Sequence, residues 1–408
     1  MKHLIILGDG MSDYPVASLG GKTPLEYADT PTFDRLAAMG KSGLLVTIPE
    51  GLQPGSEVAN ASILGYDMAK AYEGRGPLEA ASIGYVLAPE DLALRCNIVA
   101  LDDGKILNHH GGHLNSAEGR MLIECLDKEL GSSKVKLIPG IQYRHLLVVK
   151  GGSKYIECAP PHDHPGEEWE KLLVAPMENA PLEEGRLTPQ ETADLINDLI
   201  LRSQKLLSAH PFNDGRKIKA NSIWPWSGGY RPAMLTLTEM YPSIKTGVVI
   251  TAVDLIRGIG IYAGLTPVDV EGATGMADTN YEGKAEAALA ALRENDFVFL
   301  HVEASDEAGH DGDLQLKLKT IENLDKRIVD PILKEISNWN EPVAIALLPD
   351  HATPVELRVH KGEPVPFTIW HKGISPDGVS SYSEETCANG GYGLLKLGEF
   401  MQEFMKIK

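Results

Sequence analysis

Cysteine is scarce in this sequence, and no two cysteines have the spacing of a metal-binding or redox motif. The 408 residues contain Cys96, Cys125, Cys158 and Cys387. Disulfide frameworks and thiolate metal sites need cysteines in groups or pairs, so this distribution argues against both. We interpret the four thiols as small hydrophobic side chains of a core.

Positive charge is also scarce, and long apolar runs are missing. Lysine and arginine number 38 against 57 aspartate and glutamate residues, which gives a formal net charge of -19. This charge disfavours nucleic acid or an anionic membrane as a partner. No apolar stretch approaches the roughly 20 residues of a membrane span, and the N-terminal LIIL is too short for a signal peptide. The sequence therefore predicts a cytoplasmic protein in which an anionic substrate would be held by cations or a few arginines.

Apolar, β-branched segments alternate with helical patterns in the outer parts of the chain. The segments that we expect to be buried strands are 3–9, 43–48, 246–252, 296–302, 342–348 and 366–371. Helical patterns at 284–294 and 314–336 lie between them. This alternation predicts an α/β fold, with a mainly parallel sheet covered by helices on both faces.

The middle of the chain has a different pattern. Residues 92–108 and 143–152 are typical of hairpin strands, and the first contains the turn signal DDG. A long helix follows, which begins with a capping box at Thr188 and Glu191 and has proline at its first position. We therefore predict a smaller α+β domain, residues 77–243, inserted into a discontinuous domain.

The discontinuous domain comprises residues 1–76 and 244–408, and the polar residues that follow its strands include many metal ligands. These are Asp9, Asp306, His310, Asp350, His351 and His360. Each alone is typical of a turn or a surface pair. Together they follow parallel strands, whose carboxyl ends share one edge of a sheet. Oxygen and nitrogen donors without thiolate predict a pair of divalent cations such as manganese, magnesium or zinc.

Histidines of the predicted insertion have a weaker pattern. His109, His110, His162 and His164 lie in polar loops. We interpret them as solvated residues, and contact with a substrate is the alternative.

Ser56 follows the second predicted strand, between Gly55 and Glu57. Its simplest interpretation is the N-cap of the next helix. A serine hydroxyl is a poor nucleophile at neutral pH, and the histidines and aspartates that could activate it are assigned to the metals. Coordination to a cation would lower its pKa instead. A serine beside two cations predicts phosphoryl transfer.

Seven motifs together resemble one known family, the archaeal-type cofactor-independent phosphoglycerate mutases of the alkaline phosphatase superfamily. In chain order they are LGDGMSD, QPGSEVANASILGYD, GRGPLEAASIG, AVDLIRGIG, EGATGMADTNYEGKAEAA, HVEASDEAGHDGD and PDHATP. The resemblance spans nearly the whole chain. It implies an alkaline phosphatase-like domain interrupted by a smaller phosphotransferase domain, two divalent metals and a phosphoserine intermediate. The implied reaction interconverts 3-phosphoglycerate and 2-phosphoglycerate without 2,3-bisphosphoglycerate.

The resemblance also implies roles for single residues of the metal-binding domain. The ligands of one metal would be Asp9, Ser56, Asp350 and His351. Those of the other would be Asp306, His310 and His360. Manganese is the ion we expect first, with magnesium, zinc and cobalt as alternatives. Ser56 would carry the phosphoryl group, and Lys284 would contact both the serine oxygen and the phosphate, although an exposed first helical turn is its simpler interpretation.

Substrate-binding positions are implied in the insertion as well. They are His113, Arg95 and Arg231, with Arg75 as a further candidate that could instead stiffen the link between domains. Arginine suits a substrate that bears a carboxylate and a phosphate, because its planar guanidinium binds either in bidentate fashion.

Three other functions remain as alternatives to the mutase. They are a related phosphotransferase, for example one that phosphorylates homoserine, a phosphatase, and a metal-dependent binding protein without activity. The sequence has no GxxxxGK[ST] loop to support ATP use. A relay serine and a lysine beside a full ligand set argue against lost activity. The expected partner is a small phosphorylated substrate, and the sequence indicates no oligomeric state.

Overall fold

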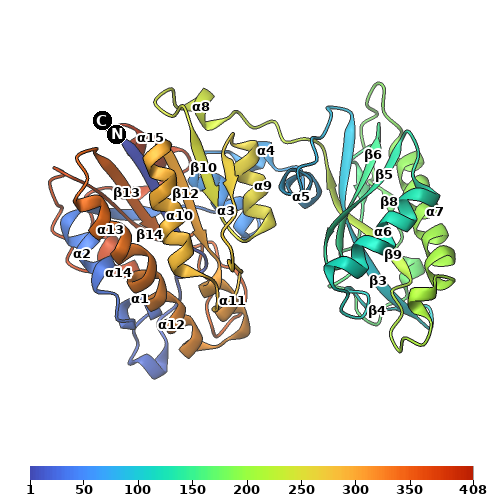
Figure 1. The fold of residues 1–408 in the computed structure, drawn as a ribbon, viewed down its shortest axis with the longest axis horizontal. Coiled ribbons are helices and arrows are strands. Elements are labelled where there is room, and N and C mark those ends of the chain that lie inside the picture. Colours follow the sequence, from blue (N-terminus) through green and yellow to red (C-terminus); the bar gives the residue numbers. More distant parts are fainter. Residues whose placement is uncertain (408) are drawn as a thin grey trace. The chain divides into compact units, whose positions relative to one another are not determined.

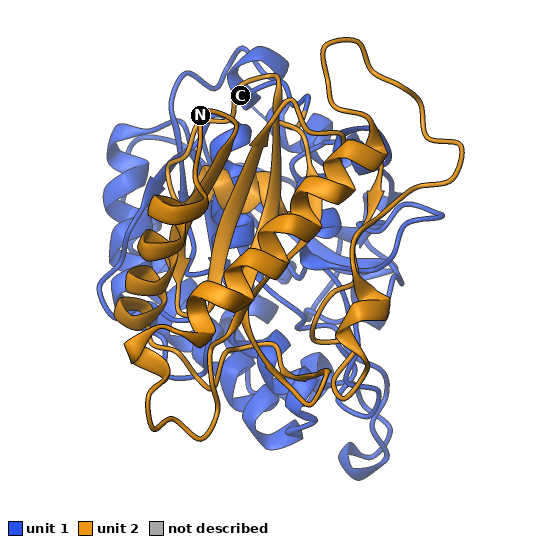
Figure 2. Ribbon diagram, turned by 90° about the vertical axis from the view of Figure 1, so that its right-hand side faces the viewer, with its two compact units in different colours: residues 1–72, 233–408 blue, residues 73–232 orange. Residues whose placement is uncertain are grey.

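The computed structural model describes residues 1–407, and the chain forms two compact units (Figure 2). Unit 1 comprises residues 1–72 and 233–408, and unit 2 comprises residues 73–232. The boundaries expected from the sequence, 77 and 243, fall slightly later in the chain. The difference at the second boundary arises because α8 (Leu237–Met240) donates the backbone N–H of Leu237 to Ala263 of unit 1.

Within the described residues, unit 1 contains an eight-stranded sheet (Figure 1). Its order is β11 (Thr266–Val268), β10 (Gly247–Ile250), β12 (Phe297–Val302), β1 (Lys2–Gly8), β13 (Val343–Leu348), β14 (Val365–His371), β2 (Lys41–Leu45) and β15 (Gly393–Leu395). Strand β1 lies inside the sheet, where Ile5 pairs with Phe299 of β12 and Ala346 of β13, both in parallel. Every residue of β1 is buried. The mainly parallel sheet expected from the apolar segments is confirmed.

Strand β14 departs from the parallel arrangement. It runs antiparallel to both β13 and β2, as in the pairs Ala346 with Ile369 and Gly43 with Phe367. The reason is the connection: residues 349–364 form a loop with no crossover helix, so the chain re-enters the sheet at the edge where β13 left it. That loop therefore stays at the carboxyl end of β13.

Helices cover both faces of this sheet. One face packs against α2 (Pro31–Met39), α10 (Tyr281–Glu294), α12 (Leu314–Leu324) and α13 (Asp330–Ser337), as Figure 1 shows. The other face carries α9 (Asp254–Tyr262) and α15 (Glu399–Met405), where Gly260 approaches Val249 and the Phe404 ring lies 5.0 Å from that of His3. The remaining helices of unit 1 are η1 (Ala17–Leu19), α1 (Pro24–Tyr27), α3 (Ser56–Ile63), α4 (Met68–Ala71), α11 (Ala304–Asp311) and α14 (Glu384–Cys387).

The helix expected at 314–336 is interrupted by a π-helical segment. Residues Asp325–Val329 form this segment between α12 and α13. Pro331 lies just after it and has no N–H to donate, and its ring would clash with the carbonyl one turn earlier. The wider π turn avoids that clash and lets the helical path continue.

Unit 2 is built on an antiparallel sheet. Its strands are β3 (Asp91–Asp102), β4 (Lys105–Asn108), β5 (Val135–Ile141), β6 (Arg144–Lys150) and β9 (Ser222–Gly229), with a separate pair β7 (Ile156–Glu157) and β8 (Ala175–Pro176). Strands β3 and β4 form the hairpin expected at DDG. Helices α6 (Ser116–Leu130) and α7 (Pro189–Ser208) pack on one face, and α5 (Arg75–Ser82) packs on the other. The short helices η2 (Trp169–Leu172) and η3 (Pro211–Asn213) complete the unit.

The capping box at the start of α7 is confirmed, since Thr188 accepts from the Glu191 N–H and Glu191 accepts from the Thr188 N–H. Across residues 1–407, no helix has the length and apolar character needed to cross a membrane.

Candidate metal centre and nucleophile

Three loops at the carboxyl ends of neighbouring strands bring acidic residues together in unit 1. Asp9 follows β1, Asp306 lies in the first turn of α11 after β12, and Asp350 follows β13. All three are buried. Gly10, with a positive φ of 62°, permits the close approach of two of these loops, because a side chain there would meet the Cα of Asp306 at 2.7 Å.

Asp9, Asp350 and His351 form the first group of metal donors, with ligand atoms within 4.8 Å of one another. The Oγ of Ser56 lies 3.2 Å from Nε2 of His351. Ser56 is the first residue of α3, so its backbone starts the helix while its hydroxyl faces the donors. The Asn60 side chain donates to the Ser56 carbonyl and to Oδ2 of Asp350, both at 2.9 Å.

Asp306, His351 and His360 form the second group. His310 joins it, because its Nε2 lies 3.2 Å from Oδ2 of Asp306 and 2.8 Å from Nε2 of His360. His351 therefore borders both groups. The two sets of ligands implied by the family resemblance lie next to each other, and every residue of both sets takes part in these contacts.

Hydrogen bonds indicate which nitrogens have free lone pairs. His310 Nδ1 lies 3.0 Å from the Arg358 carbonyl, which can only accept, so Nδ1 carries a proton, and Nε2 is the nitrogen that a cation would bind in place of its own proton. That nitrogen faces Asp306 and Nε2 of His360. Asp9 Oδ1 is buried without a hydrogen-bond partner among the described residues. Converging nitrogens and an unpartnered carboxylate oxygen fit divalent cations.

The pKa shifts of the buried carboxyl groups also favour a bound cation. Burial, followed by repulsion from Asp350 and Glu303, raises the pKa of Asp9 well above its usual value. Burial and Asp306 likewise raise the pKa of Glu303 to about 8. Burial would also raise the pKa of Asp306, but hydrogen bonds with His310 and His360 hold it well below its usual range. A bound cation would offset the repulsion between these closely packed carboxylates.

His301 and Glu303 belong to this centre, although the sequence reasoning did not single them out. They form a third group with Asp9. His301 lies 2.8 Å from Oδ2 of Asp9 through Nε2, and 3.1 Å from the hydroxyl of Thr251 through Nδ1. The carboxylate can only accept, so His301 donates to Asp9 and orients it. The motif HVE could have indicated both residues, because alternate residues of a strand point to the same face and His301 and Glu303 are separated by one residue.

Lys284 lies in the first turn of α10 and is fully buried, so the alternative of an exposed helical turn is wrong. Its ammonium donates to the His301 carbonyl at 3.2 Å. Burial lowers the pKa of Lys284 to about 8, against the opposing effect of Glu303. Among the described residues, no hydrogen bond joins Lys284 to Ser56.

In unit 2, Arg95 lies at the centre of a group of aromatic and basic side chains. Its guanidinium pairs with Glu79 at 3.1 Å and lies 5.0 Å from the centre of the Trp226 ring. The His162 ring lies 5.0 Å from Trp226 and 6.0 Å from His109. Three of the four histidines interpreted as solvated, His109, His110 and His162, thus lie against other rings, and His162 is also exposed.

The other predicted substrate-binding residues differ in exposure and contacts, and Arg75 lies close enough to Arg95 for its charge to help lower the Arg95 pKa, after the larger effect of burial. His113 is exposed, and its ring stacks on His110 with centroids 3.9 Å apart. Arg75 begins α5 and donates its backbone N–H to the Ser227 hydroxyl. Arg231 is exposed beyond the end of β9. His164 pairs with Glu167 at 3.0 Å.

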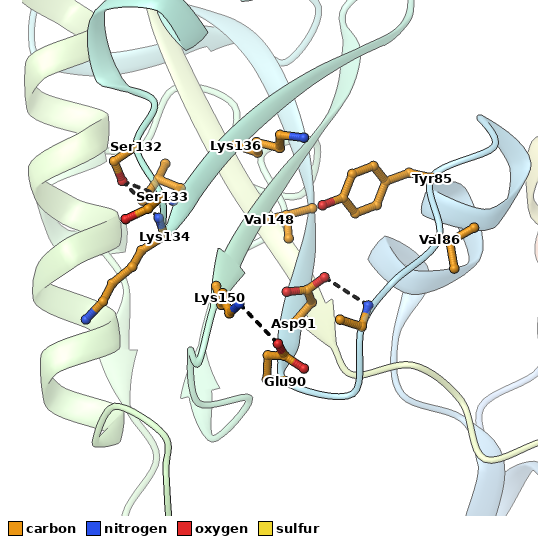
Figure 3. A pocket seen from close by; sticks show the side chains of 12 residues that line it. Tyr85, Val86, Glu90, Asp91, Ser132, Ser133, Lys134, Lys136, Val148 and Lys150 are labelled. Atoms are coloured by element: carbon orange, nitrogen blue, oxygen red, sulfur yellow. Dashed lines mark hydrogen bonds and ion pairs between the residues drawn. The ribbon is translucent and has the colours of Figure 1, made fainter.

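Unit 2 also has a cavity of about 370 Å³ beside β5 and β6 (Figure 3). Three lysines line it, namely Lys134, Lys136 and Lys150. Its carboxylates are engaged, because Glu90 pairs with Lys150 at 3.2 Å and Asp91 accepts from the Ala88 N–H. It resembles the donor groups of unit 1 in neither chemistry nor burial.

A mainly parallel α/β sheet with a serine among oxygen and nitrogen donors at its carboxyl edge is typical of metal-dependent phosphoryl-transfer enzymes. The comparisons with known proteins narrow this class. A family profile described as 2,3-bisphosphoglycerate-independent phosphoglycerate mutase matches residues 37–213. A protein of that name from Methanosarcina barkeri is 47% identical over 414 residues, which cover all of both chains. The chain belongs to the family of 2,3-bisphosphoglycerate-independent phosphoglycerate mutases.

Other relatives agree with this membership. A probable 2,3-bisphosphoglycerate-independent phosphoglycerate mutase from Geobacter sulfurreducens is 45% identical, with 96% of each chain covered. A solved structure of a Pyrococcus horikoshii protein is 30% identical, covers 99% of this chain and 97% of its own, and has a TM-score of 0.82. The cofactor-independent phosphoglycerate mutase from Thermoplasma acidophilum is 26% identical over all of both chains, with a TM-score of 0.70.

Proposed function

We propose that this protein interconverts 3-phosphoglycerate and 2-phosphoglycerate by passing the phosphoryl group through Ser56, with two divalent cations and without 2,3-bisphosphoglycerate. Family membership supports the reaction. The observation that supports the route is the position of the Ser56 hydroxyl, 3.2 Å from His351 and beside both groups of donors.

The two groups of donors support a choice of ligands for each cation. One cation would be held by Asp9, Ser56, Asp350 and His351. The other would be held by Asp306, His310 and His360. Bound there, the cations would lower the pKa of the serine hydroxyl and neutralise the phosphoryl oxygens. Manganese suits a mixed set of carboxylate and imidazole donors, with magnesium, zinc and cobalt as alternatives.

The protein's own residues would perform two displacements. In the first, a bond forms between Ser56 Oγ and phosphorus while the bond from phosphorus to the 3-oxygen of the substrate breaks; the serine loses a proton and the glycerate oxygen gains one. In the second, a bond forms between the 2-oxygen of glycerate and phosphorus while the bond from phosphorus to Ser56 Oγ breaks; the 2-hydroxyl loses a proton and the serine oxygen gains one. Asn60 would hold Ser56 and Asp350 in a fixed position relative to each other, since its side chain donates to the Ser56 carbonyl and to the Asp350 carboxylate.

Lys284 and the basic residues of unit 2 would bind the anionic groups. The buried ammonium of Lys284, held by the His301 carbonyl, supplies positive charge for the transferring oxygens. Arg95, His113, Arg231 and Arg75 are the proposed partners of the substrate's carboxylate and phosphate. Unit 1 would thus carry the metals and the relay serine, and unit 2 would recognise the substrate.

One assay tests this function against its alternatives. The protein is incubated with 3-phosphoglycerate and manganese, and enolase reports 2-phosphoglycerate while free phosphate is measured in parallel. We expect enolase-dependent signal without added bisphosphoglycerate or ATP and without stoichiometric phosphate release. Phosphate without 2-phosphoglycerate would indicate a phosphatase. Formation of homoserine phosphate only with ATP would indicate a kinase.

A further inference from the structure

Lys317 is a buried cation to which the proposed reaction assigns no role. It lies on α12, and its side chain is fully buried. Its ammonium donates to Asp13 Oδ2 at 2.7 Å, to the Thr353 carbonyl at 2.8 Å and to the Ser12 carbonyl at 3.2 Å. An ammonium has three protons, so every one of them has an acceptor.

The acceptors belong to the two loops that carry the first group of donors. Ser12 and Asp13 lie in the loop that begins with Asp9, and Thr353 lies in the loop that begins with Asp350. Further bonds join the same loops: the Thr353 N–H donates to the Ser12 carbonyl at 3.2 Å, and the Val355 N–H donates to Asp13 Oδ2 at 3.1 Å. Lys317 is therefore the charged centre of a buried junction between these loops.

The Thr353 side chain extends this junction to the metal donors themselves. Its hydroxyl lies 2.5 Å from Asp306 Oδ1 and 3.2 Å from His351 Nδ1. An ionised carboxylate can only accept, so the hydroxyl proton points to Asp306. The hydroxyl then accepts from the Nδ1–H of His351, which leaves the Nε2 lone pair of His351 directed toward Ser56.

We propose that Thr353 and Lys317 are positioning residues of the metal centre. Thr353 joins a carboxylate of the second group to the shared imidazole and fixes the tautomer of that imidazole, and Lys317 with Asp13 holds the backbone of Thr353 in place. The proposal rests on the two-cation site proposed above. It assigns to the pair Thr353 and Lys317 the arrangement of the donor side chains that would hold the cations.

Manganese binding to the metal-free protein tests the role of Thr353. Calorimetric titration with Mn²⁺ should give two sites in the unmodified protein. Thr353→Val keeps the shape but removes the hydroxyl, and we expect its Mn²⁺ affinity to fall roughly 10- to 100-fold, as is usual when a group that orients a ligand is lost. Thr353→Ser keeps the hydroxyl and should restore most of the affinity.

Lys317 requires a pair of variants, because Lys317→Met alone leaves the Asp13 carboxylate buried without its partner and could unfold the protein. Lys317→Met combined with Asp13→Asn removes both charges. We expect this double variant to fold but to bind Mn²⁺ more weakly than the unmodified protein. Lys2→Met is the matched control: Lys2 is 8% exposed and donates to the Arg293 carbonyl, at the opposite end of β1 from Asp9.

The outcomes separate the two proposals. If the unmodified protein bound no Mn²⁺, the two-cation site and this inference would both be wrong. If it bound two ions and Thr353→Val bound them equally well, only the role of Thr353 would be refuted. A double variant with unchanged affinity would reduce Lys317 and Asp13 to a purely structural pair. Loss of affinity in Lys2→Met would show that any buried lysine has this effect, and that would also overturn the inference.

Discussion

Asp9 and His301 are 292 residues apart in the chain, and a 2.8 Å hydrogen bond joins their side chains. The position of Asp9 after a strand was enough to predict that it would lie near Asp306 and Asp350, because strand ends gather at one edge. The partners that orient these ligands could not be predicted in the same way. His301 and Thr353 act through single hydrogen bonds whose existence depends on the exact packing of loops.

Ser56 is the residue on which the proposed relay depends. Ser56→Ala removes one hydroxyl, and we expect it to reduce conversion of 3-phosphoglycerate at least about a thousand-fold, because both steps of the proposed route pass through this oxygen. The enolase-coupled assay measures this loss. Intact-protein mass spectrometry should detect a phosphoryl group in the unmodified protein after incubation with substrate, and none in the variant.

Ser62 provides the matched control for that substitution. It is a buried serine on the same helix, α3. Ser62→Ala should leave activity within a few-fold of normal. Retention of mutase activity by Ser56→Ala, with Ser62→Ala also active, would favour direct transfer without a serine intermediate.

At the scale of helices and strands, the apolar, β-branched segments that alternate with helical patterns predicted most of the sheet. It placed β1, β10, β12 and β13 within two residues of their observed bounds. It could not predict that β14 is antiparallel, because direction depends on the length and path of the connection and not on the strand's own residues. The π segment before Pro331 was missed for a similar reason, since an uninterrupted helical pattern continues through it.

Helix α7 offers a prediction about local stability. Its capping box satisfies two backbone N–H groups through Thr188 and Glu191. We expect Thr188→Ala to lower the local stability of the helix by about 1 kcal/mol. Hydrogen exchange of the amides in the first turns of α7 measures this change. Thr188→Ser keeps the acceptor and should exchange at nearly the normal rate; equal acceleration in both variants would mean that the hydroxyl bond contributes little.

For the whole molecule, the net charge is -19, and part of this negative charge lies on buried acidic side chains at the carboxyl edge of unit 1. There Asp9, Glu303 and Asp350 are packed close together away from water. From the overall charge we predicted that an anionic substrate would need cations or a few arginines, and the buried carboxylates of unit 1 mark the position where cations would bind. Metal removal should therefore change both stability and its dependence on pH.

The direction of that dependence follows from the raised pKa values of the metal-free protein. The pKa of His310 is raised to about 9 by its hydrogen bond with Asp306, and that of Glu303 to about 8 by burial. A folded-state pKa above the unfolded value gives stability that is present below the unfolded pKa and is lost as the pH rises through the folded pKa. His310 therefore contributes fully below about pH 6.5, and Glu303 below about pH 4.5. Both contributions are lost by about pH 9.

We expect the melting temperature of chelator-treated protein to fall between pH 6.5 and pH 8, because the lowered pKa of Lys284 adds the opposite trend only above about pH 8. Manganese should have the opposite dependence, because its ligands must be deprotonated, so the stabilisation that it adds should grow over the same range. Differential scanning fluorimetry with and without Mn²⁺ measures both trends. Glu303→Gln removes one of these titrating groups and should flatten the decline of the metal-free protein. A melting temperature that rises with pH in the presence of chelator would mean that these groups are not held in the protonated, hydrogen-bonded state from which the prediction follows.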